Sequence, residues 1–435
     1  MAGEWETIRL GDLCDVITKG TTPTTLGYKF TETGINFVKS ECVSFDGWID
    51  LSKFTFIDEA THEALKRSQL QEGDILFSMA GVYIGKTAIV PKAILPANTN
   101  QAVGIVRLNK RRAIPHFIDY HLRNPSYNLF LNNLVAQSAQ PNLNLTEIRN
   151  LPITLPPLPE QKAIAAILGA LDDKIELNRR MNATLEAMAR ALFQSWFVDF
   201  DPVRAKIDGR QPTNVDPATA GLFPEQLDDS PLGQIPRGWE ATTLGACIGF
   251  RSGFSFKSQD WREFGVPVVK IGSVKPGVID LSQVSYVSDE IAQQAARYRL
   301  STGDMLIGMT GYVGEVGLVP PSDNPPLLNQ RVGKFVMAKP GTATLAFWYC
   351  AMRQPEFKAF VETRSHGTAQ ANVSGESILE FPLVVPPSGI LDAFNRDCQP
   401  LLDRILSNHG ESRTLAALRD TLLPKLLSGE VRVVP

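Results

Sequence analysis

Cysteine is scarce in this chain of 435 residues, and the few cysteines are scattered along it. No two of them have the spacing of ligands in a structural metal site, and an odd number cannot all be paired in disulfides. We therefore expect free thiols, which persist in the reducing environment of a cytoplasm. The five residues are Cys14, Cys42, Cys247, Cys350 and Cys398.

Long apolar runs are absent as well. No stretch reaches the roughly 18 apolar residues that indicate a membrane-spanning helix, so no contact with a membrane is expected. The first residues, Met1–Trp5, have neither the basic start nor the apolar segment of an export signal. Together these absences predict a cytoplasmic protein.

Positive charge is not in excess. Lysine and arginine number 43 against 46 aspartate and glutamate residues, which gives a net charge of −3. This balance is not the bulk signature of a nucleic-acid-binding protein. Recognition of DNA needs only a local basic face, however, so the balance leaves nucleic acid open as a ligand.

Common catalytic motifs do not occur. The segment Gly81–Thr87 is one residue short of a phosphate-binding P-loop, and its later counterpart has no lysine. The segment Asn324–Leu327 lacks the aromatic residue that would stack on a flipped base. The five histidines include no His-Glu-x-x-His pair. We predict neither a catalytic site nor a metal site in this chain.

A long internal duplication organises the sequence. Trp5–Gly11 returns as Trp239–Gly245, and Gly73–Gly81 returns as Gly303–Gly311. The offset between the copies starts at 234 residues and settles near 230. Such a period is far too long for a solenoid, so the sequence predicts a globular domain followed by a helix, used twice.

Each copy begins with short β-type runs, punctuated by glycine and proline, and ends in a long helical stretch. This pattern predicts an α+β fold with two similar globular domains, separated by two long helices and related by a pseudo-two-fold axis. Between the copies, proline, aspartate and glycine are frequent and no periodicity is present. The predicted segments are a first domain at 1–157, a first long helix at 158–200, an extended linker at 201–235, a second domain at 236–387, and a second long helix with a C-terminal tail at 388–435.

Apolar residues in both predicted helices alternate at spacings of three and four, which is the seam of a coiled coil. Asn178 and Asn182 interrupt the first seam near its middle, and Asn408 and Ser412 interrupt the second at the same offset. Chain connectivity favours an antiparallel pair, in which these polar residues meet and fix the register. The alternative is two amphipathic helices that each pack on their own domain. Pro400 predicts a kink or a late start of the second helix.

Several motifs together resemble the specificity subunit of type I restriction–modification systems over essentially the whole chain. They are the Trp…Leu-Gly domain starts at Trp5 and Trp239, the Gly-Asp turns at Gly73 and Gly303, the Pro-Pro-Leu-Pro-Glu-Gln-Lys162 start of the first helix, and Phe197-Val-Asp-Phe-Asp-Pro202 after that helix. The second helix departs from the pattern, because Pro386-Pro387-Ser-Gly-Ile lacks the Pro-Glu-Gln.

This resemblance implies a non-catalytic subunit. Each globular domain would be a target-recognition domain that reads half of a bipartite, gapped site in double-stranded DNA. The helices would set the gap and dock two methyltransferase subunits, and a motor-nuclease subunit would join them for cleavage. S-adenosylmethionine, ATP and Mg²⁺ would be bound by those partners and not by this chain.

Basic residues are the candidates for DNA contact, since lysine and arginine bind phosphates and read guanine. Solvated surface charge is the alternative for each of them. A glutamine and an asparagine recur in both copies shortly before the long helix. Features shared by both domains cannot distinguish two half-sites, so architecture or backbone contact is favoured for this pair. The candidates for DNA contact are Lys39, Arg107, Arg111, Arg112, Lys270, Arg331 and Lys334, and the recurring polar residues are Gln140, Asn142, Gln370 and Asn372.

Two other functions are compatible with these features. One is a protein-binding scaffold without DNA contact, and the other is a stand-alone DNA-modifying enzyme with an unrecognised site. The DNA target is not encoded in a readable motif, because it depends on which side chains reach the grooves and on DNA shape.

Overall fold

The computed structural model describes residues 5–80, 84–125, 127, 129–131, 142–213, 215–337, 345–365 and 372–433. The chain divides into two compact units. Unit 1 consists of Met1–Lys174 and Leu415–Pro435, and unit 2 consists of Ile175–Thr414. Each unit therefore contains one globular domain and part of both long helices, α5 (Leu158–Phe193) and α13 (Ser388–Ser428).

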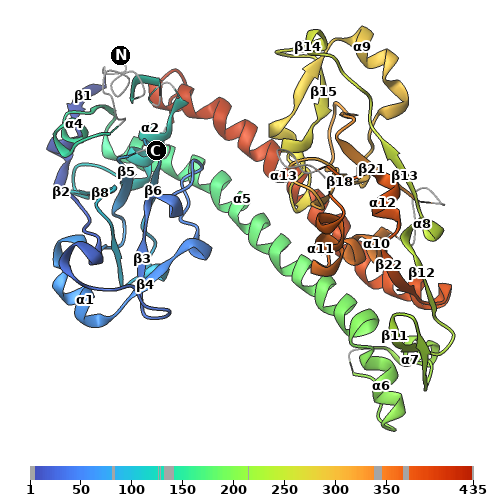
Figure 1. Ribbon diagram of the computed structural model, residues 1–435. Helices are drawn as coiled ribbons and strands as arrows, with labels where there is room; N and C mark the ends of the chain where they lie inside the picture. The colour runs from blue at the N-terminus through green and yellow to red at the C-terminus, as the bar shows by residue number, and fades with distance from the viewer. Residues whose placement is uncertain are drawn as a thin grey trace. The chain divides into compact units, whose positions relative to one another are not determined.

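Unit 1 is built from short strands and helices. Its strands are β1 (Glu6–Arg9), β2 (Cys14–Lys19), β3 (Ile35–Val38), β4 (Thr55–Ile57), β5 (Ile75–Ser78), β6 (Thr87–Ile89), β7 (Ala97–Thr99), β8 (Val103–Leu108) and β9 (Pro152–Leu155), and its other helices are α1 (Glu59–Ala64), α2 (Pro115–Arg123) and α4 (Leu145–Arg149). The strands form sheets of order β2-β8-β5-β6 and β4-β3-β7, and β1 pairs with β9 (Figure 1). The pair β3–β7 is parallel, and the other pairs are antiparallel.

The central strands β5 and β8 are covered on both faces. Their side chains are almost all buried, which explains why they are continuous apolar runs without polar alternation. Phe77 packs on one face with Phe117 of α2 and Leu168 of α5. Leu76, its neighbour in the strand, packs on the opposite face with Val38. Successive residues of a strand point to opposite faces, so β5 contributes to two cores at once.

Unit 2 repeats this architecture. Its strands are β10 (Leu227–Ser230), β11 (Gly233–Pro236), β12 (Glu240–Thr243), β13 (Gly249–Ser252), β14 (Trp261–Arg262), β15 (Val266–Val269), β16 (Gly277–Val278), β17 (Ser285–Val287), β18 (Met305–Gly308), β19 (Val316–Leu318), β20 (Leu327–Leu328), β21 (Val332–Val336) and β22 (Pro382–Val385), and its other helices are α6 (Asp201–Ile207), α7 (Pro217–Leu222), α8 (Leu244–Cys247), α9 (Asp289–Gln294), α10 (Leu345–Met352), α11 (Pro355–Thr363) and α12 (Gly375–Leu379). The sheet orders are β13-β21-β18-β19-β16 and β14-β17-β15-β20, with β12 paired to β22. Apart from the added β14 and β16, the orders match those of unit 1, and the predicted duplicated α+β fold is confirmed.

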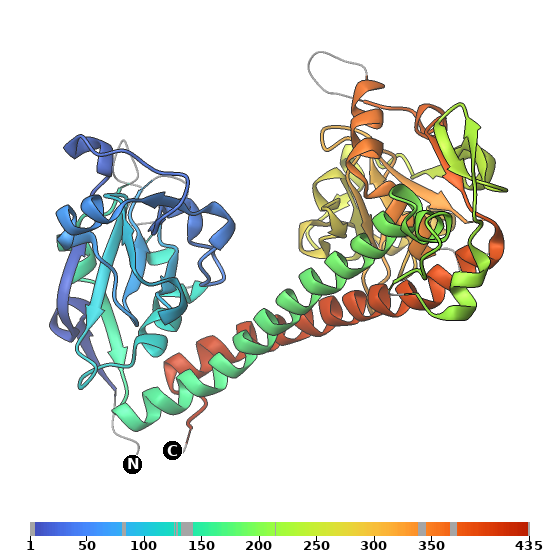
Figure 2. The ribbon, with the colours of Figure 1, turned by 90° about the horizontal axis from the view of Figure 1, so that it is seen from below.

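The two long helices run antiparallel within each unit. In unit 1, Asp172 of α5 pairs with Arg419 of α13, and Glu160, earlier in α5, pairs with Arg432 beyond the end of α13. In unit 2, the second half of α5 lies along the first half of α13 (Figure 2). Position numbers rise on one helix as they fall on the other, so the predicted antiparallel pairing is confirmed, and the alternative of helices that contact only their own domains is wrong.

The four predicted register residues form one hydrogen-bonded cluster in unit 2. Asn178 Nδ2 donates to Ser412 Oγ at 3.3 Å and to Glu411 Oε2 at 2.8 Å. Asn408 Nδ2 donates to Asn182 Oδ1 at 2.7 Å. Asn178 and Asn408 are buried, and an amide group buried without hydrogen bonds is costly. A shift of register would break these bonds, and the role of the cluster in setting the register stays a prediction.

The start of the first long helix is explained by Gln161. Its buried side chain accepts a hydrogen bond from Ile114 N at 3.0 Å, ahead of α2, and donates to Pro156 O at 2.8 Å. The second helix has no glutamine there. Asn395, one turn later, accepts a hydrogen bond from Phe347 N of α10 at 3.2 Å. Each long helix is therefore tied, through one buried amide, to a domain helix that precedes it in the chain, α2 or α10, although the motif is absent from the second copy.

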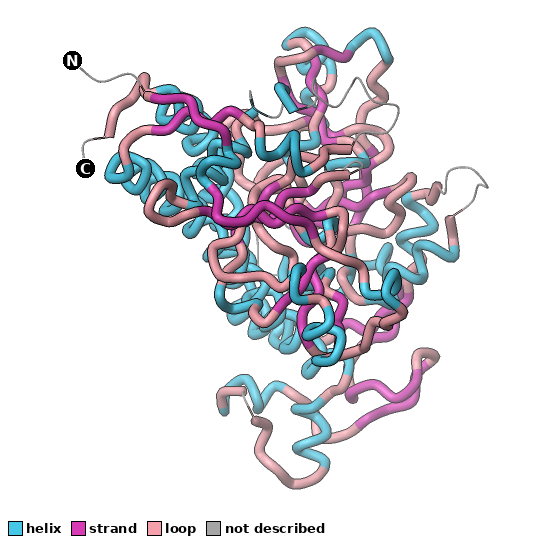
Figure 3. The backbone as a smooth tube through the Cα atoms, turned by 90° about the vertical axis from the view of Figure 1, so that its left-hand side faces the viewer, coloured by secondary structure: helices cyan, strands magenta, loops and turns pink. Residues whose placement is uncertain are grey.

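The expectation of an extended linker at 201–235 is wrong. This segment contains α6, α7 and the hairpin β10–β11 (Figure 3). Val203, Phe223 and Ile235 are buried in the core of unit 2. The apolar residues are too widely spaced to give a helical or strand period, and only the tertiary contacts order the segment.

The expected late start of the second helix is also wrong. Helix α13 begins at Ser388 and continues through Pro400 to Ser428. A proline inside a helix removes one backbone hydrogen bond, and tertiary packing has to compensate for that loss. Cys398 and Leu402, on either side of Pro400, are both buried in the core of unit 2, which supplies this packing.

His121 gives unit 1 a testable dependence on pH. Burial against Phe117 and Tyr127 lowers the pKa of His121 to about 4. In the unfolded chain His121 takes up a proton near pH 6.5, but in the folded chain it does so only near pH 4. Its contribution to the free energy of unfolding is therefore complete above pH 6.5 and is lost as the pH falls from 6.5 to 4. The shift corresponds to about 3 kcal/mol. Urea unfolding from pH 7 to 4 should show this loss in the wild type and a shallower slope in His121→Phe. The exposed His116 of the same helix provides the control, His116→Gln, which should retain the wild-type slope.

Candidate nucleic-acid interface

The parallel strand pairs end at equivalent turns in the two units. In unit 1, Lys39 follows β3 and Asn100 follows β7. In unit 2, Lys270 follows β15 and Asn329 follows β20. Each asparagine side chain accepts a hydrogen bond from the backbone N–H two residues later, at 3.2 Å in unit 1 and 3.1 Å in unit 2. Asn100-Gln101 recurs in the second copy as Asn329-Gln330, and in each unit this dipeptide forms a turn beside a lysine at one edge of the domain.

A glycine brings a further strand against each turn. A Cβ atom on Gly20, after β2, would lie 2.1 Å from Thr99 O. A Cβ atom on Gly253, after β13, would lie 2.4 Å from Asn329 O. Contacts this short with backbone atoms leave no room for a larger residue. The ends of β2 and β13 consequently lie at the same edges as Lys39 and Lys270.

Two cations mark this edge in unit 1. Arg67 is the middle residue of a 3-10 turn, η5 (Lys66–Ser68), and its Nη2 donates to Thr21 Oγ1 at 3.1 Å. Lys39 Nζ lies 4.9 Å from the ring centre of Phe30 and 4.0 Å from the carboxylate of Glu41. We call Lys39 and Arg67 the basic edge of unit 1.

The equivalent edge of unit 2 is richer in cations. Arg297 is the middle residue of η12 (Ala296–Tyr298), and its Nη2 donates to Tyr298 Oη at 2.5 Å. Arg251 Nη1 donates to Arg297 O at 3.4 Å, and Arg299 Nη1 donates to Pro325 O at 3.0 Å. Lys270 Nζ lies 4.8 Å from the ring centre of Trp261. We call Lys270, Arg251, Arg297, Arg299 and Arg331 the basic edge of unit 2.

The arginines of these edges lack carboxylate counter-ions. The acceptors of Arg67, Arg251, Arg297 and Arg299 are hydroxyl or carbonyl oxygens, and no ion pair in the described part of the chain includes them or Arg331. A guanidinium group whose acceptors are neutral oxygens keeps its charge available to an anion, and arginine binds phosphate through strong, charge-assisted hydrogen bonds. The edges are therefore suited to a phosphate backbone, even in a protein of net charge −3.

Two of the predicted DNA contacts, Arg107 and Lys334, are held in equivalent ion pairs. Arg107 Nε lies 2.7 Å from Asp74 Oδ1, and Lys334 Nζ lies 2.6 Å from Asp304 Oδ2. Hydrogen bonding to Asp74 raises the pKa of Arg107, although burial opposes the shift. Both aspartates follow the repeated glycine turn, so each pair ties a central strand to that turn. The geometry favours a structural role, and contact of these two residues with DNA stays a prediction.

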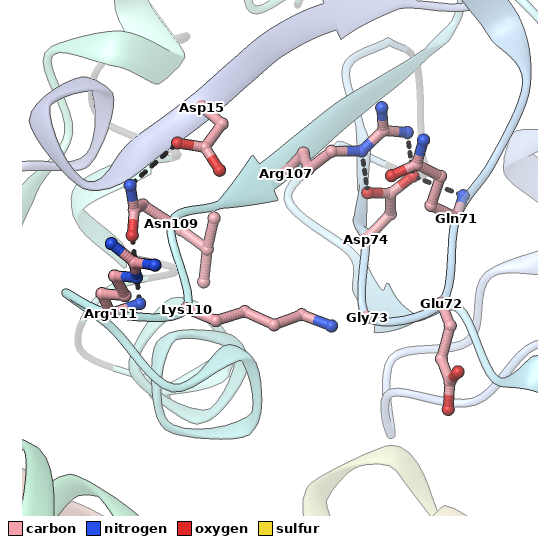
Figure 4. Close-up of a pocket in the computed structure, with 10 residues that line it drawn as sticks. Asp15, Gln71, Glu72, Gly73, Asp74, Arg107, Asn109, Lys110 and Arg111 are labelled. Atoms are coloured by element: carbon pink, nitrogen blue, oxygen red, sulfur yellow. Dashed lines mark hydrogen bonds and ion pairs between the residues drawn. The ribbon is translucent and has the colours of Figure 1, made fainter.

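The remaining candidates of unit 1 lie at the far end of β8. Arg111 is exposed beside a hollow of about 390 Å³, where lysine and arginine mix with carboxylates (Figure 4). Arg112 donates a hydrogen bond to Asp12 O. Strand β8 has six residues and spans about 20 Å, so Lys39 and Arg111 lie at opposite ends of it. The candidates therefore do not form one surface.

Only part of the recurring glutamine–asparagine pair can be placed. Asn142 forms a β-bridge with Ala80, and Asn372 forms the equivalent bridge with Thr310. The Asn372 side chain also accepts a hydrogen bond from Thr310 Oγ1 at 3.0 Å. These contacts favour the architectural role, which stays a prediction. Gln140 and Gln370, like residues 81–83 of the P-loop-like segment, lie outside the described residues.

The described residues contain neither a metal site nor a membrane-spanning helix. Within the described ranges, no group of three or more His, Cys, Asp or Glu side chains is placed to hold a metal ion. No helix in that part of the chain is both long and apolar enough to cross a bilayer.

Four arginines of the basic edges were not predicted from the sequence. They are Arg67, Arg251, Arg297 and Arg299. One signal could have found two of them, because Arg67 and Arg297 occupy the same offset of 230 residues as the other repeated positions. Arg251 and Arg299 have no basic counterpart and become neighbours only through the pairing of β13 with the sheet and of Arg299 with Leu327.

The comparisons with known proteins agree on one family. The model of the family described as "Type I restriction modification DNA specificity domain" matches residues 2–187 and again residues 236–412. The type I restriction enzyme HindI specificity subunit of Haemophilus influenzae is 26% identical over an alignment 414 residues long, and the match covers 84% of this chain and 88% of that protein. The MjaIX specificity subunit of Methanocaldococcus jannaschii is 24% identical over 441 residues, covering 99% of this chain and 94% of that protein.

A solved structure with a similar fold also belongs to such a system. It is the S subunit of a type I restriction–modification system from M. genitalium, with a TM-score of 0.57 and 16% sequence identity. The match covers 97% of this chain and 96% of that chain, so the similarity of fold extends over both copies of the duplication.

Proposed function

The chain belongs to the family of type I restriction–modification DNA specificity proteins, and we propose that it reads a bipartite DNA site with one globular domain on each half-site. Residues 1–157 and 236–387 are the two target-recognition domains in this proposal. The two copies have diverged in sequence, so the two half-sites differ. The paired helices fix the register of the domains and thereby the gap in the site.

The observation that carries this proposal is the duplicated basic edge. Two domains of equal topology present a lysine, and arginines that have no carboxylate partner among the described residues, at the ends of the same strands. A protein scaffold would have no reason to retain this feature twice, whereas a duplex offers the same polyanionic backbone at both half-sites.

Catalysis belongs to partner subunits in this proposal. Two methyltransferase subunits dock on the chain and bind S-adenosylmethionine, and a motor-nuclease subunit that uses ATP and Mg²⁺ joins for cleavage. The chain itself binds no cofactor and works in the cytoplasm. The names of the relatives support such partners in general terms, since each is the specificity subunit of a restriction enzyme.

Binding of defined duplexes tests the function. The target motif is first taken from adenine-methylation maps of cells with and without this chain. The chain in complex with its methyltransferase subunit should then bind a motif duplex roughly 10³-fold or more tightly than a duplex with either half scrambled, at one stated salt concentration. A duplex with one base pair added to the gap should also bind weakly. Equal binding to all of these duplexes would contradict the proposal.

A further inference from the structure

The two basic edges contain positions of two kinds. We propose that the cations retained in both units, Arg67 with Arg297 and Lys39 with Lys270, hold DNA phosphates, whereas the unit-specific Arg299 reads a guanine in the second half-site. This assignment rests on the proposed function and goes beyond it. It separates the residues that provide affinity for any DNA from one residue that provides sequence specificity.

The arginine pair is equivalent in structure as well as in sequence. Arg67 and Arg297 are each the middle residue of a three-residue 3-10 turn that follows a short helix, α1 in unit 1 and α9 in unit 2. Both side chains are exposed. A single neutral hydroxyl orients each guanidinium, Thr21 Oγ1 for Arg67 and Tyr298 Oη for Arg297. The hydroxyl groups that accept these hydrogen bonds come from different residues, but both units place an exposed guanidinium group at the same position of the fold.

The two lysines show the same pattern: the charge recurs in both units, but the residue that it contacts differs. Lys39 and Lys270 follow equivalent parallel strands, and each ammonium group lies over an aromatic ring, Phe30 in unit 1 and Trp261 in unit 2. Each ring restricts the motion of the lysine side chain, because the cation–π contact stabilises this position by a small amount of free energy. An ammonium group is a point charge with rotatable donors, which suits a phosphate oxygen better than a pattern of base atoms.

Arg299 differs from its structural counterpart. Gln69 and Arg299 both cap the 3-10 turn, and both form a β-bridge, with Asn98 and with Leu327 respectively. The Gln69 amide is turned inward and donates to His62 O at 2.9 Å. Arg299 is exposed, and its Nη1 donates to Pro325 O at 3.0 Å, the one side-chain hydrogen bond that it makes to the described residues. The rest of its guanidinium fork remains available for a bidentate contact.

DNA chemistry distinguishes these two kinds of position. Phosphates are identical at both half-sites, so cations that bind them are useful in both copies and are retained as the copies diverge. Base pairs differ between the half-sites, so the residues that read them must differ. An arginine fork matches the O6 and N7 acceptors of guanine in the major groove. The second half-site should therefore contain a guanine that depends on Arg299.

The test uses the chain in complex with its methyltransferase subunit and two duplexes, the mapped motif and a scrambled sequence. Arg297→Ala should weaken binding to both duplexes by the same factor. It should also reduce the slope of log K, the logarithm of the binding constant, against log salt concentration by about 1. The double variant Arg67→Ala/Arg297→Ala should reduce the slope by about 2, and Arg297→Lys should restore it. Arg299→Ala should weaken binding to the motif duplex roughly 5- to 150-fold. In methylation maps of cells with this variant, sites with another base in place of one guanine of the second half-site should also be methylated.

The control is Arg237→Ala, which removes an exposed arginine paired with Asp228 and should change neither duplex. Co-elution of each variant with the methyltransferase subunit checks that it is folded. A changed motif in Arg297→Ala, or equal losses on both duplexes in Arg299→Ala, would overturn the assignment. If the wild-type complex does not distinguish motif from scrambled DNA, the proposed function itself fails, whatever the variants show.

Discussion

Replacement of Arg123 by alanine is expected to lower the free energy of unfolding of unit 1 by about 3–5 kcal/mol, because it leaves a buried carboxylate without its counter-ion. Arg123 Nε lies 2.9 Å from Asp119 Oδ2, and its Nη2 lies 3.2 Å from Asp172 Oδ2. The side chains of Arg123 and Asp119 are 11% and 4% exposed. Burial alone would lower the pKa of Arg123, but the charges of the two aspartates raise it.

The two aspartates should respond differently to this change. Asp172 retains an ion pair with Arg419 of α13 at 2.8 Å. Asp119 loses its charged partner in the buried interior, so the double variant Arg123→Ala/Asp119→Ala should be less destabilised than the sum of the single variants. Amide hydrogen exchange of α2, measured on the full chain, reports the change where it occurs.

A matched control comes from an exposed ion pair of the same unit. Lys53 Nζ lies 3.0 Å from Asp50 Oδ2, and the Lys53 side chain is 54% exposed. Lys53→Ala should cost no more than about 1 kcal/mol. If Arg123→Ala and Lys53→Ala had similar effects on α2, the ionic cluster would not hold the domain to α5.

Replacement of Trp196 by alanine is expected to destabilise unit 2 by about 3–5 kcal/mol, since it opens a large cavity in an aromatic core. Trp196 is 1% exposed, and its ring centre lies 5.2 Å from that of Phe223 and 5.8 Å from that of Phe394. Phe223 belongs to the segment between the two copies, and Phe394 belongs to α13. The substitution should therefore release the 201–236 segment as well as loosen the helices.

Limited proteolysis and urea unfolding measure these two effects. Cleavage within 201–236 should become much faster in Trp196→Ala than in the wild type. Met188 lies in α5, ahead of the π-helical segment Gln194–Val198 that contains Trp196, and is 52% exposed. Met188→Ala should stay within about 0.5 kcal/mol of the wild type and keep its cleavage rate. Unchanged cleavage in Trp196→Ala would show that Phe223 is held by other contacts.

The duplicated fold could be read from the sequence because repeats and periodicity are local in the chain. The paired motifs at Gly73 and Gly303 predict equal turns, and both are followed by central strands of equal order. The alternation of apolar residues in the long helices predicts their pairing, because side chains three and four residues apart share one face of a helix. Asn178 and Asn408 could be singled out because polar residues in such a seam are rare.

Other parts of the chain could not be predicted, since distant contacts decide them. The segment 201–235 has few apolar residues, and Phe223 and Ile235 become core residues only where Trp196 and Trp239 are brought beside them. Among the candidate DNA contacts, no local signal separates Arg107, which is balanced by Asp74, from Arg331, which has no ion pair within the described residues. A carboxylate 33 positions away in the chain settles that difference.

The duplication, the α+β class, the two long antiparallel helices and the family can all be inferred from the sequence. Each depends on the spacing of motifs or on the period of apolar residues, and both can be read along the chain without knowing which residues are in contact. Which basic side chains lie side by side on the surface depends on the tertiary structure. Arg251 joins Arg297 and Arg299 because β13 lies beside η12 at the edge of the sheet, and Gly253 lets the backbone approach closely enough for this. Charge is a property of single residues, but a binding surface depends on which residues the fold makes neighbours.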